Sequence, residues 1–184
     1  MTSPTESQNP SKTPLNRSAA SADQAALPSL LIRAVGSGLF TGYIPFASGT
    51  AGSFLGLLIF LIPGFSNPSA FLPALAAVFL LGLSTATEME KHYGRDPSVV
   101  TIDEVIGMWI ALAFLPMSTM VIAAAFVLFR VFDIVKPFPA RRFDTMAGGF
   151  GIMMDDVVAG LYTNIVLQLL LLLPPVKLMI GDVL

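Results

Sequence analysis

Two adjacent carboxylates, Asp155 and Asp156, lie near the start of a long apolar run that ends in five consecutive leucines. A charged side chain at the mouth of a membrane-like helix is costly unless water, a basic side chain or a metal ion stabilises it. The same arrangement occurs twice more, where Asp103 and Glu104 open an apolar segment and where Asp133 follows one. This recurrence predicts a site built from carboxylate oxygens, and Mg²⁺ is the divalent cation that suits such oxygens best.

Basic side chains accompany the third acidic position. Arg130 and Lys136 each lie three residues from Asp133, so either can meet it on a helix surface. Arg141 and Arg142 follow in a loop. An ion-pair ladder at a membrane boundary would account for these charges without any chemistry. If the cations instead receive an anionic group, carboxylates for a metal beside cations for an anion favour phosphoryl chemistry on a lipid headgroup.

The stretch Ser48–Ser53 contains only Ser, Gly, Thr and Ala and runs directly into an apolar helix. Small residues at a helix start leave backbone N–H groups free to bind an anion, so Thr50 and Ser53 are candidate phosphate-binding residues. Ordinary N-capping and close helix packing by glycine are the alternative. Farther along, Thr101 and Glu104 match a Thr-x-x-Glu capping box, which would explain Glu104 structurally.

Composition restricts the possible mechanisms. The chain has no cysteine, which excludes thiolate phosphatases, and its single histidine, His92, makes phosphohistidine catalysis unfavourable. His92 lies in a polar connection, where a solvated role is the usual one. No Asp-x-Asp sequence, as used by aspartyl-phosphate enzymes, is present. Attack by a metal-activated water remains, with an Asp nucleophile as the alternative.

The composition is that of an integral membrane protein. Apolar residues make up 54 % of the 184 residues, charged residues only 12 %, and the mean hydropathy is +0.77. The net charge is −2 and no basic stripe is present, so nucleic acid is not an expected partner. Residues 1–27 are rich in Ser, Thr, Pro, Asn and Gln and predict a disordered tail, which leaves 28–184 as a single membrane-embedded domain.

Five apolar segments predict an all-α, multi-pass bundle of about four or five short helices, preceded by an interfacial N-terminal helix within residues 28–46. The segments are 54–62, 71–85, 105–115, 120–132 and a fifth that ends at Leu173. If all five cross, nearly all charge falls on one side, which the positive-inside rule makes cytoplasmic. The three acidic positions and the Ser48–Ser53 helix start would then meet at one membrane face.

Four motifs in series resemble the phosphatidylglycerophosphatase A family. They are Ser48-Gly-Thr-Ala-Gly-Ser53, Asp103-Glu-Val-Ile-Gly-Met-Trp-Ile110, Phe126-Val-Leu-Phe-Arg-Val-Phe-Asp-Ile-Val-Lys-Pro-Phe-Pro139 and Gly149-Phe-Gly-Ile-Met-Met-Asp-Asp-Val-Val-Ala-Gly160. The resemblance covers about residues 36–172 and implies a Mg²⁺-dependent lipid phosphatase of the bacterial inner membrane. Such an enzyme would hydrolyse phosphatidylglycerophosphate to phosphatidylglycerol and phosphate at the cytoplasmic leaflet. Ser48 departs from the family pattern, which often has Pro before Gly-Thr.

The resemblance also implies roles for individual side chains. The acidic, catalytic set would be Asp103, Glu104, Asp133, Asp155 and Asp156, and the phosphate-binding set would be Thr50, Ser53, Arg130 and Lys136. Within the acidic set, we assign Asp103, Asp155 and Asp156 to Mg²⁺ and the attacking water. Glu104 is a candidate base or outer ligand, and Asp133 either binds the metal or orients Arg130. Because neighbours on a helix point about 100° apart, Asp155 and Asp156 should not act as one clamp.

Three other functions are compatible with parts of this pattern. A CDP-alcohol phosphotransferase would also use clustered aspartates and a metal, but it would need further Asp at helical spacing after Asp156, and none follows. A small membrane transporter would place ionisable groups in the middle of its apolar segments, whereas here they lie at the ends. A non-catalytic membrane scaffold would have no use for the carboxylate cluster.

Overall fold

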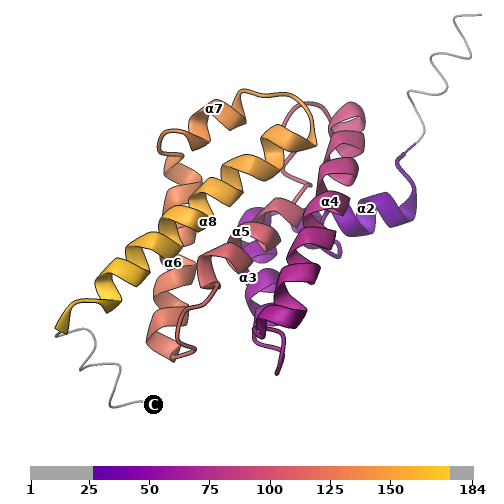
Figure 1. Cartoon of the computed structure of the whole chain (residues 1–184). Helices are drawn as coiled ribbons and strands as arrows, with labels where there is room; N and C mark the ends of the chain where they lie inside the picture. The colour runs from indigo at the N-terminus through magenta and orange to yellow at the C-terminus, as the bar shows by residue number, and fades with distance from the viewer. Residues whose placement is uncertain (1–26, 175–184) are drawn as a thin grey trace, which may run out of the picture.

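The computed structural model describes residues 27–174, and within that range all regular secondary structure is helical (Figure 1). The elements are α2 (Leu30–Gly36), the 3₁₀ turn η1 (Thr41–Tyr43), α3 (Ser48–Phe60), α4 (Pro68–Tyr93), α5 (Ile102–Leu112), α6 (Thr119–Val135), α7 (Ala140–Asp144) and α8 (Gly149–Leu171). The predicted all-α membrane helical bundle is confirmed. The tail predicted for residues 1–27 lies outside the described residues, except for Leu27.

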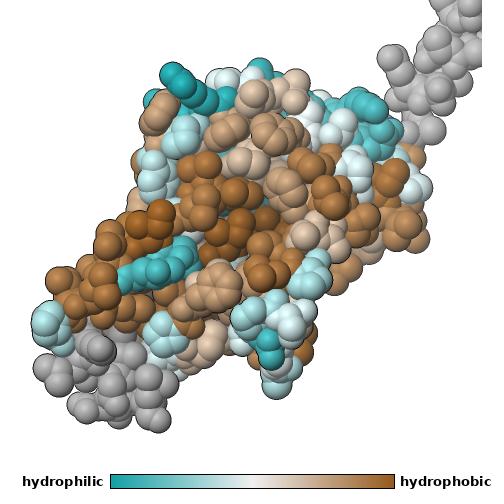
Figure 2. All heavy atoms as spheres, in the orientation of Figure 1, coloured by the Kyte–Doolittle hydropathy of each residue, from teal (hydrophilic) through white to brown (hydrophobic). Residues whose placement is uncertain are grey.

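Two helices of the described range, α4 and α8, are long and apolar enough to cross a membrane, with 26 and 23 residues. On α8 the exposed large apolar side chains recur at helical spacing, at Leu161, Ile165, Leu169 and Leu172. Figure 2 shows this hydrophobic surface running down α8, while hydrophilic residues gather at the opposite end, beside α7 and the end of α4. The face of the bundle seen in Figure 2 is therefore apolar along α8 and hydrophilic at the end beside α7.

The helices that contain the apolar segments 54–62 and 105–115 are short, as these segments predict. α5 has 11 residues and α3 has 13. At about 1.5 Å per residue, α5 is roughly 17 Å long and cannot cross a hydrocarbon core of about 30 Å by itself. Since α5 contacts both α3 and α8 along its length, it is a helix buried within the bundle. The packing of α5 against its neighbours therefore brings the acidic positions together, and no alternation of five membrane-spanning segments is needed.

Helix α4 extends farther than the apolar segment 71–85. Asn67 accepts a hydrogen bond from the Ser69 N–H at its start, and Gly94, with φ of +94°, ends it. The residues from Glu88 to His92, predicted as part of a polar connection, therefore form the last helical turns. Hydropathy does not predict these turns, because charged residues interrupt the apolar pattern of a helix without interrupting its hydrogen bonds.

Glycines let α5 approach its neighbours closely. A Cβ added at Gly160 of α8 would lie 2.4 Å from the Gly107 carbonyl oxygen of α5. On the other side, a Cβ at Gly56 of α3 would lie 3.0 Å from the Val105 Cα, and the Trp109 indole donates to the Gly56 carbonyl at 2.9 Å. Small residues at these crossings permit backbone contact, which fixes α5 between the helices that carry the other functional side chains.

Gly160→Ala should destabilise the folded protein by about 1–3 kcal/mol, because the added methyl group meets backbone and cannot be accommodated by a side-chain rotation. Thermal unfolding in detergent would measure the change. Leu161→Ala is a matched control, since that side chain is exposed on the same helix. Equal unfolding temperatures for Gly160→Ala and wild type would show that the α5–α8 crossing is not close-packed.

Candidate active site

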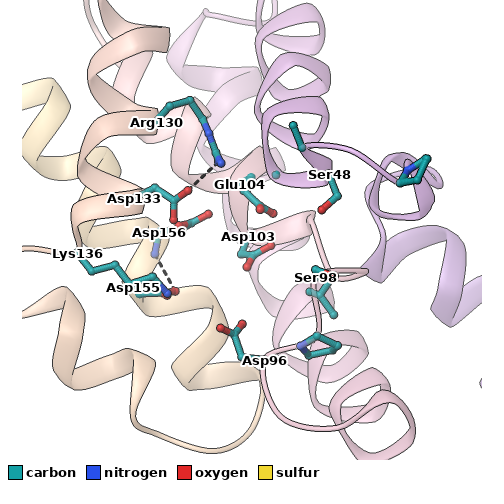
Figure 3. A pocket seen from close by; sticks show the side chains of 15 residues that line it. Ser48, Asp96, Ser98, Asp103, Glu104, Arg130, Asp133, Lys136, Asp155 and Asp156 are labelled. Atoms are coloured by element: carbon teal, nitrogen blue, oxygen red, sulfur yellow. Dashed lines mark hydrogen bonds and ion pairs between the residues drawn. The ribbon is translucent and has the colours of Figure 1, made fainter.

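A cavity of about 470 Å³ lies where α3, the loop before α5, α5, α6 and α8 meet (Figure 3). Its charged lining residues are Asp96, Asp103, Glu104, Arg130, Asp133, Lys136, Asp155 and Asp156. All five acids singled out from the sequence thus share one cavity with the two predicted phosphate-binding cations. We call this cavity the acidic pocket.

Three carboxylates form its buried centre. Asp103, Glu104 and Asp156 each offer an oxygen, and these oxygens lie within 4.8 Å of one another. The side chains are deeply placed, with Asp103 only 8 % and Asp156 only 2 % exposed. Burial, and next the nearby Asp103 charge, raise the pKa of Glu104 well above its usual value. Three acids cannot share this space in ionised form without a compensating cation.

Each of these three side chains also has an oxygen that is left without a hydrogen bond. Asp103 Oδ1, Glu104 Oε2 and Asp156 Oδ2 are buried and find no partner in the described part of the chain. Buried polar atoms are nearly always satisfied, so three orphaned oxygens side by side indicate a ligand. Oxygen donors of this kind are the ones that Mg²⁺ binds, and the residues therefore fit the predicted metal.

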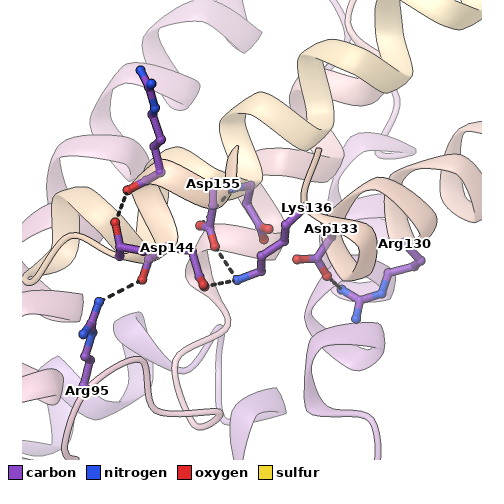
Figure 4. Close-up of polar contacts among 9 residues, drawn as sticks. Arg95, Arg130, Asp133, Lys136, Asp144 and Asp155 are labelled. Atoms are coloured by element: carbon purple, nitrogen blue, oxygen red, sulfur yellow. Dashed lines mark hydrogen bonds and ion pairs between the residues drawn. The ribbon is translucent and has the colours of Figure 1, made fainter. Parts of the chain in front are cut away.

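Asp155 points away from this group. Its Oδ2 accepts a hydrogen bond from Lys136 Nζ at 2.7 Å, and Lys136 also pairs with Asp144 (Figure 4). Burial lowers the pKa of Lys136, but the hydrogen bonds to Asp144 and Asp155 outweigh it and raise the pKa above its usual value. The lysine is therefore charged, and Asp155 holds it in place. The structure groups Glu104, rather than Asp155, with the other two predicted metal ligands.

Arg130 is held from two sides. Its Nη1 lies 2.7 Å from Asp133 Oδ2 and donates to Ser53 Oγ at 3.2 Å, while its buried Nε has no partner among the described residues. The expected Arg130–Asp133 pair is therefore formed. The second possible pair, Asp133 with Lys136, is not, because Lys136 ends α6 in a left-handed conformation with φ of +47°. That turn directs the lysine to Asp144 and Asp155.

The start of α3 forms one wall. Ser48 and Gly49 line the acidic pocket, and Ala47, the N-cap residue, provides no side-chain cap for the first N–H groups of the helix. A Cβ added at Gly49 would lie 2.5 Å from Glu104 Oε1 and 2.9 Å from Arg130 Nη2, so a larger residue would displace these two side chains. Thr50, a predicted phosphate-binding residue, is exposed and does not line the cavity.

The predicted capping box at the start of α5 is wrong. Thr101 is the N-cap residue, but its side chain makes no capping hydrogen bond. Its buried hydroxyl instead lies 2.9 Å from the Thr41 hydroxyl. Glu104 turns toward the acidic pocket. The Thr-x-x-Glu spacing is present in the sequence, but tertiary contacts hold both side chains away from the N–H groups that they would cap.

Asp96 is a lining residue that sequence reasoning missed. It lies in the loop before α5 in a left-handed conformation with φ of +44°, and Figure 3 shows its carboxylate directed into the cavity. Burial raises its pKa, and Lys136 partly opposes that shift. The only sequence signal was an Asp-Pro pair after a glycine, which is typical of any turn.

Helix α4 positions the start of α8 and so the two aspartates that α8 carries. The Gly149 N–H donates to Thr87 Oγ1 at 2.8 Å, and the Gly148 N–H donates to Glu90 Oε2 at 2.6 Å. A Cβ on Gly149 would lie 2.1 Å from the Leu83 carbonyl oxygen. The charged end of α4 thus caps the first N–H groups of α8. This capping is the structural role of the last turns of α4.

Comparisons with known proteins agree with this site. Residues 34–171 match the family model described as Phosphatidylglycerophosphatase A. Phosphatidylglycerophosphatase A of Haemophilus influenzae is 43 % identical over 140 residues, which cover 72 % of this chain and 83 % of the relative. Phosphatidylglycerophosphatase A of Escherichia coli strain K12 is 37 % identical over 130 residues, or 69 % of this chain and 74 % of the relative.

A further relative carries a different name. The Putative phosphatidylinositol-3-phosphatase of Bacteroides thetaiotaomicron is 42 % identical over 148 residues, which cover 76 % of this chain and 93 % of the relative. No solved structure matches the chain. The family match spans the four motifs and every charged residue of the acidic pocket. The chain therefore belongs to the phosphatidylglycerophosphatase A family and is a phosphatase.

Proposed function

We propose that this phosphatase hydrolyses phosphatidylglycerophosphate to phosphatidylglycerol and inorganic phosphate, at the cytoplasmic face of a bacterial inner membrane. The two relatives named phosphatidylglycerophosphatase A support the substrate. The observation that carries the proposal is the acidic pocket, where three orphaned carboxylate oxygens lie in the same cavity as Arg130 and Lys136. A metal-binding group beside fixed cations is suited to a phosphate monoester.

We assign Asp103, Glu104 and Asp156 to Mg²⁺. When bound, the ion would supply Lewis-acid polarisation of a phosphoryl oxygen and lower the pKa of a bound water. The oxygens of these carboxylates lie close together and repel one another when ionised. Their burial excludes bulk water from the site. Asp155, assigned to the metal by resemblance, instead orients Lys136 through the 2.7 Å hydrogen bond.

The remaining charged side chains act on the phosphate and on protons. Arg130 and Lys136 neutralise charge on the transferred phosphoryl group, with Ser53 and Asp133 fixing the guanidinium. Water adds to phosphorus, the bond from phosphorus to the glycerol oxygen breaks, and that oxygen takes up a proton from solvent. Asp96 lines the pocket and forms no hydrogen bond or ion pair within the described residues, so its carboxylate is available to accept the proton of the attacking water.

A second candidate substrate is phosphatidylinositol 3-phosphate, because the Bacteroides relative carries that activity in its name. Both lipids present a phosphate monoester on a polyol linked to a phosphodiester. Phosphate release by the purified protein in nonionic detergent would decide between them, with phosphatidic acid as a third substrate. We expect the highest kcat/KM with phosphatidylglycerophosphate. A higher value with the inositol lipid would replace the proposed substrate.

Removal of divalent metal should abolish activity. Treatment with EDTA is expected to reduce phosphate release by at least about a hundredfold, and excess Mg²⁺ should restore it, because the carboxylate group loses its compensating charge. The loss must be reversible and must not occur with EDTA already saturated with Mg²⁺. Full activity after chelation and removal of metal would refute the assignment of Asp103, Glu104 and Asp156.

Asp96→Asn should lower kcat by about a hundredfold, the usual contribution of a positioned base. The Mg²⁺ concentration for half-maximal activity should not change, because Asp96 is not among the three grouped carboxylates. Steady-state kinetics at varied Mg²⁺ would measure both values. Glu88→Gln is the control, since Glu88 pairs with Lys91 on the exposed face of α4. A shifted Mg²⁺ requirement with normal kcat would instead make Asp96 a metal ligand.

A further inference from the structure

A second cavity, of about 550 Å³, lies beside the acidic pocket at the end of α6. It is lined by Val135, Lys136, Pro137, Phe138, Arg141, Arg142 and Thr145, and we call it the basic pocket. Lys136 lines both cavities. The two cavities therefore adjoin at the Lys136 side chain.

Among the described residues, none of those that line the basic pocket is acidic. Arg141 and Arg142 are exposed, and within residues 27–174 neither forms a salt bridge. The guanidinium carbon of Arg142 lies 4.7 Å from the centre of the Phe138 ring, which restricts its position. Two uncompensated guanidinium groups thus stand next to a site for a phosphate monoester, and such groups bind phosphate oxygens well.

Apolar side chains border the basic pocket. Val135 and Phe138 line it and are 60 % and 65 % exposed. Exposed apolar and aromatic side chains next to arginines are typical of a membrane interface, where acyl chains meet headgroups. A lipid in this position could keep its chains in the bilayer while its headgroup reached the protein.

We propose that the basic pocket binds the phosphodiester group of the same lipid whose terminal phosphate monoester is hydrolysed in the acidic pocket. This inference rests on the proposed function and identifies the residues that select its substrate class. Phosphatidylglycerophosphate carries both groups, joined by one glycerol. The diester does not react, so Arg141 and Arg142 contribute equally to substrate and transition-state binding, which affects KM and leaves kcat unchanged.

A simpler role for Arg141 and Arg142 would be general attraction to anionic membrane lipids. The two roles differ in what they discriminate. A phosphodiester subsite distinguishes lipids with a diester from small phosphates, and its effect persists where the substrate is the only anionic lipid. General attraction depends on net charge and would be weakened equally by removing other cations from the polar end of the molecule.

The test is competition kinetics of Arg141→Gln/Arg142→Gln in mixed micelles of a nonionic detergent. Phosphate release from phosphatidylglycerophosphate is inhibited with phosphatidylglycerol, which has only the diester, or with inorganic phosphate, which has none. We expect KM and the inhibition constant of phosphatidylglycerol to rise about tenfold. The inhibition constant of inorganic phosphate and kcat should stay within about twofold of wild type. Lys91→Gln/Arg95→Gln, with the same loss of charge, should match wild type throughout.

Three results would overturn the inference: an unchanged constant for phosphatidylglycerol, a parallel change in all four parameters, or an equal rise in the control variant. The last two would assign the arginines to folding or to general charge attraction. The proposed function is tested separately by the wild-type rate. If wild type prefers phosphatidylinositol 3-phosphate, the proposed substrate fails, and the same competition is run with that lipid, which also carries a diester.

Discussion

Asp156→Asn is expected to lower kcat by at least about a thousandfold, equivalent to about 4 kcal/mol of transition-state stabilisation. Asp156 is 2 % exposed, and its Oδ2 is one of the three orphaned oxygens in the acidic pocket. An amide offers one neutral oxygen in place of a carboxylate, so the site loses a full negative charge. Phosphate release at saturating Mg²⁺ would measure the loss.

The same variant should be more stable than wild type in the absence of metal. A buried carboxylate next to Asp103 and Glu104 destabilises the fold through desolvation and repulsion, which the amide removes. Thermal unfolding with EDTA should therefore show a higher midpoint for Asp156→Asn, and added Mg²⁺ should raise the midpoint of wild type only. Glu88→Gln controls for the chemical change. A variant that is both inactive and less stable would mean a structural role for Asp156.

Arg130→Lys is expected to reduce kcat/KM by about a hundredfold even though the positive charge is retained. The guanidinium contacts Asp133 and Ser53 through Nη1 alone, and its buried Nε has no partner within the described residues, whereas a lysine ammonium has one nitrogen for every contact. The transferred phosphoryl group would then lose a positioned donor. Steady-state kinetics with the lipid substrate would measure the change.

Arg95→Lys is the matched control for Arg130→Lys. Arg95 is exposed and, within residues 27–174, donates only to the Asp144 carbonyl oxygen, so the same replacement there should leave kcat/KM within about twofold. Guanidinium ion added to Arg130→Ala should restore part of the lost rate, which a purely structural arginine would not allow. Normal kinetics for Arg130→Lys would mean that charge alone suffices at this position.

The helical class and the membrane character could be predicted because they depend on composition and on runs of apolar residues. The lengths of the helices could not. Hydropathy ends where charge begins, so the end of α4 was missed although Glu90 caps α8 there. The apolar segment 105–115 is too short to predict a full span, and α5 is indeed a short helix that packs against α3 and α8, although it ends at Leu112.

The acidic pocket could be predicted as a set of residues but not as a geometry. Each acid adjoins an apolar helix, and that pattern was enough to gather Asp103, Asp133 and Asp156. The roles of Asp155 and Glu104 depend on the direction of each side chain, which the crossing of α5 and α8 at Gly107 and Gly160 sets. Asp155 therefore faces Lys136, and Glu104 faces the carboxylate group. Helical geometry alone predicts that the side chains of two neighbouring aspartates point in different directions.

Connecting segments gave the weakest signal. Asp96 lies in a loop, whereas Arg142, expected in a loop, lies in the short helix α7. Nothing in the spacing shows that Asp96 lines the acidic pocket and Arg142 the basic pocket. Thr101 and Glu104 gave a misleading signal, since a local capping pattern was present but tertiary contacts prevailed.

The central claim is that Asp103, Glu104 and Asp156 bind the divalent cation on which phosphatase activity depends. Electron paramagnetic resonance of Mn²⁺, a paramagnetic cation with similar oxygen ligands, tests it most directly in the detergent-purified protein. We predict one bound Mn²⁺ per chain in wild type, displaced by Mg²⁺ over the range in which Mg²⁺ supports activity, and none in Asp156→Asn. Equal Mn²⁺ binding by wild type and Asp156→Asn would contradict the account.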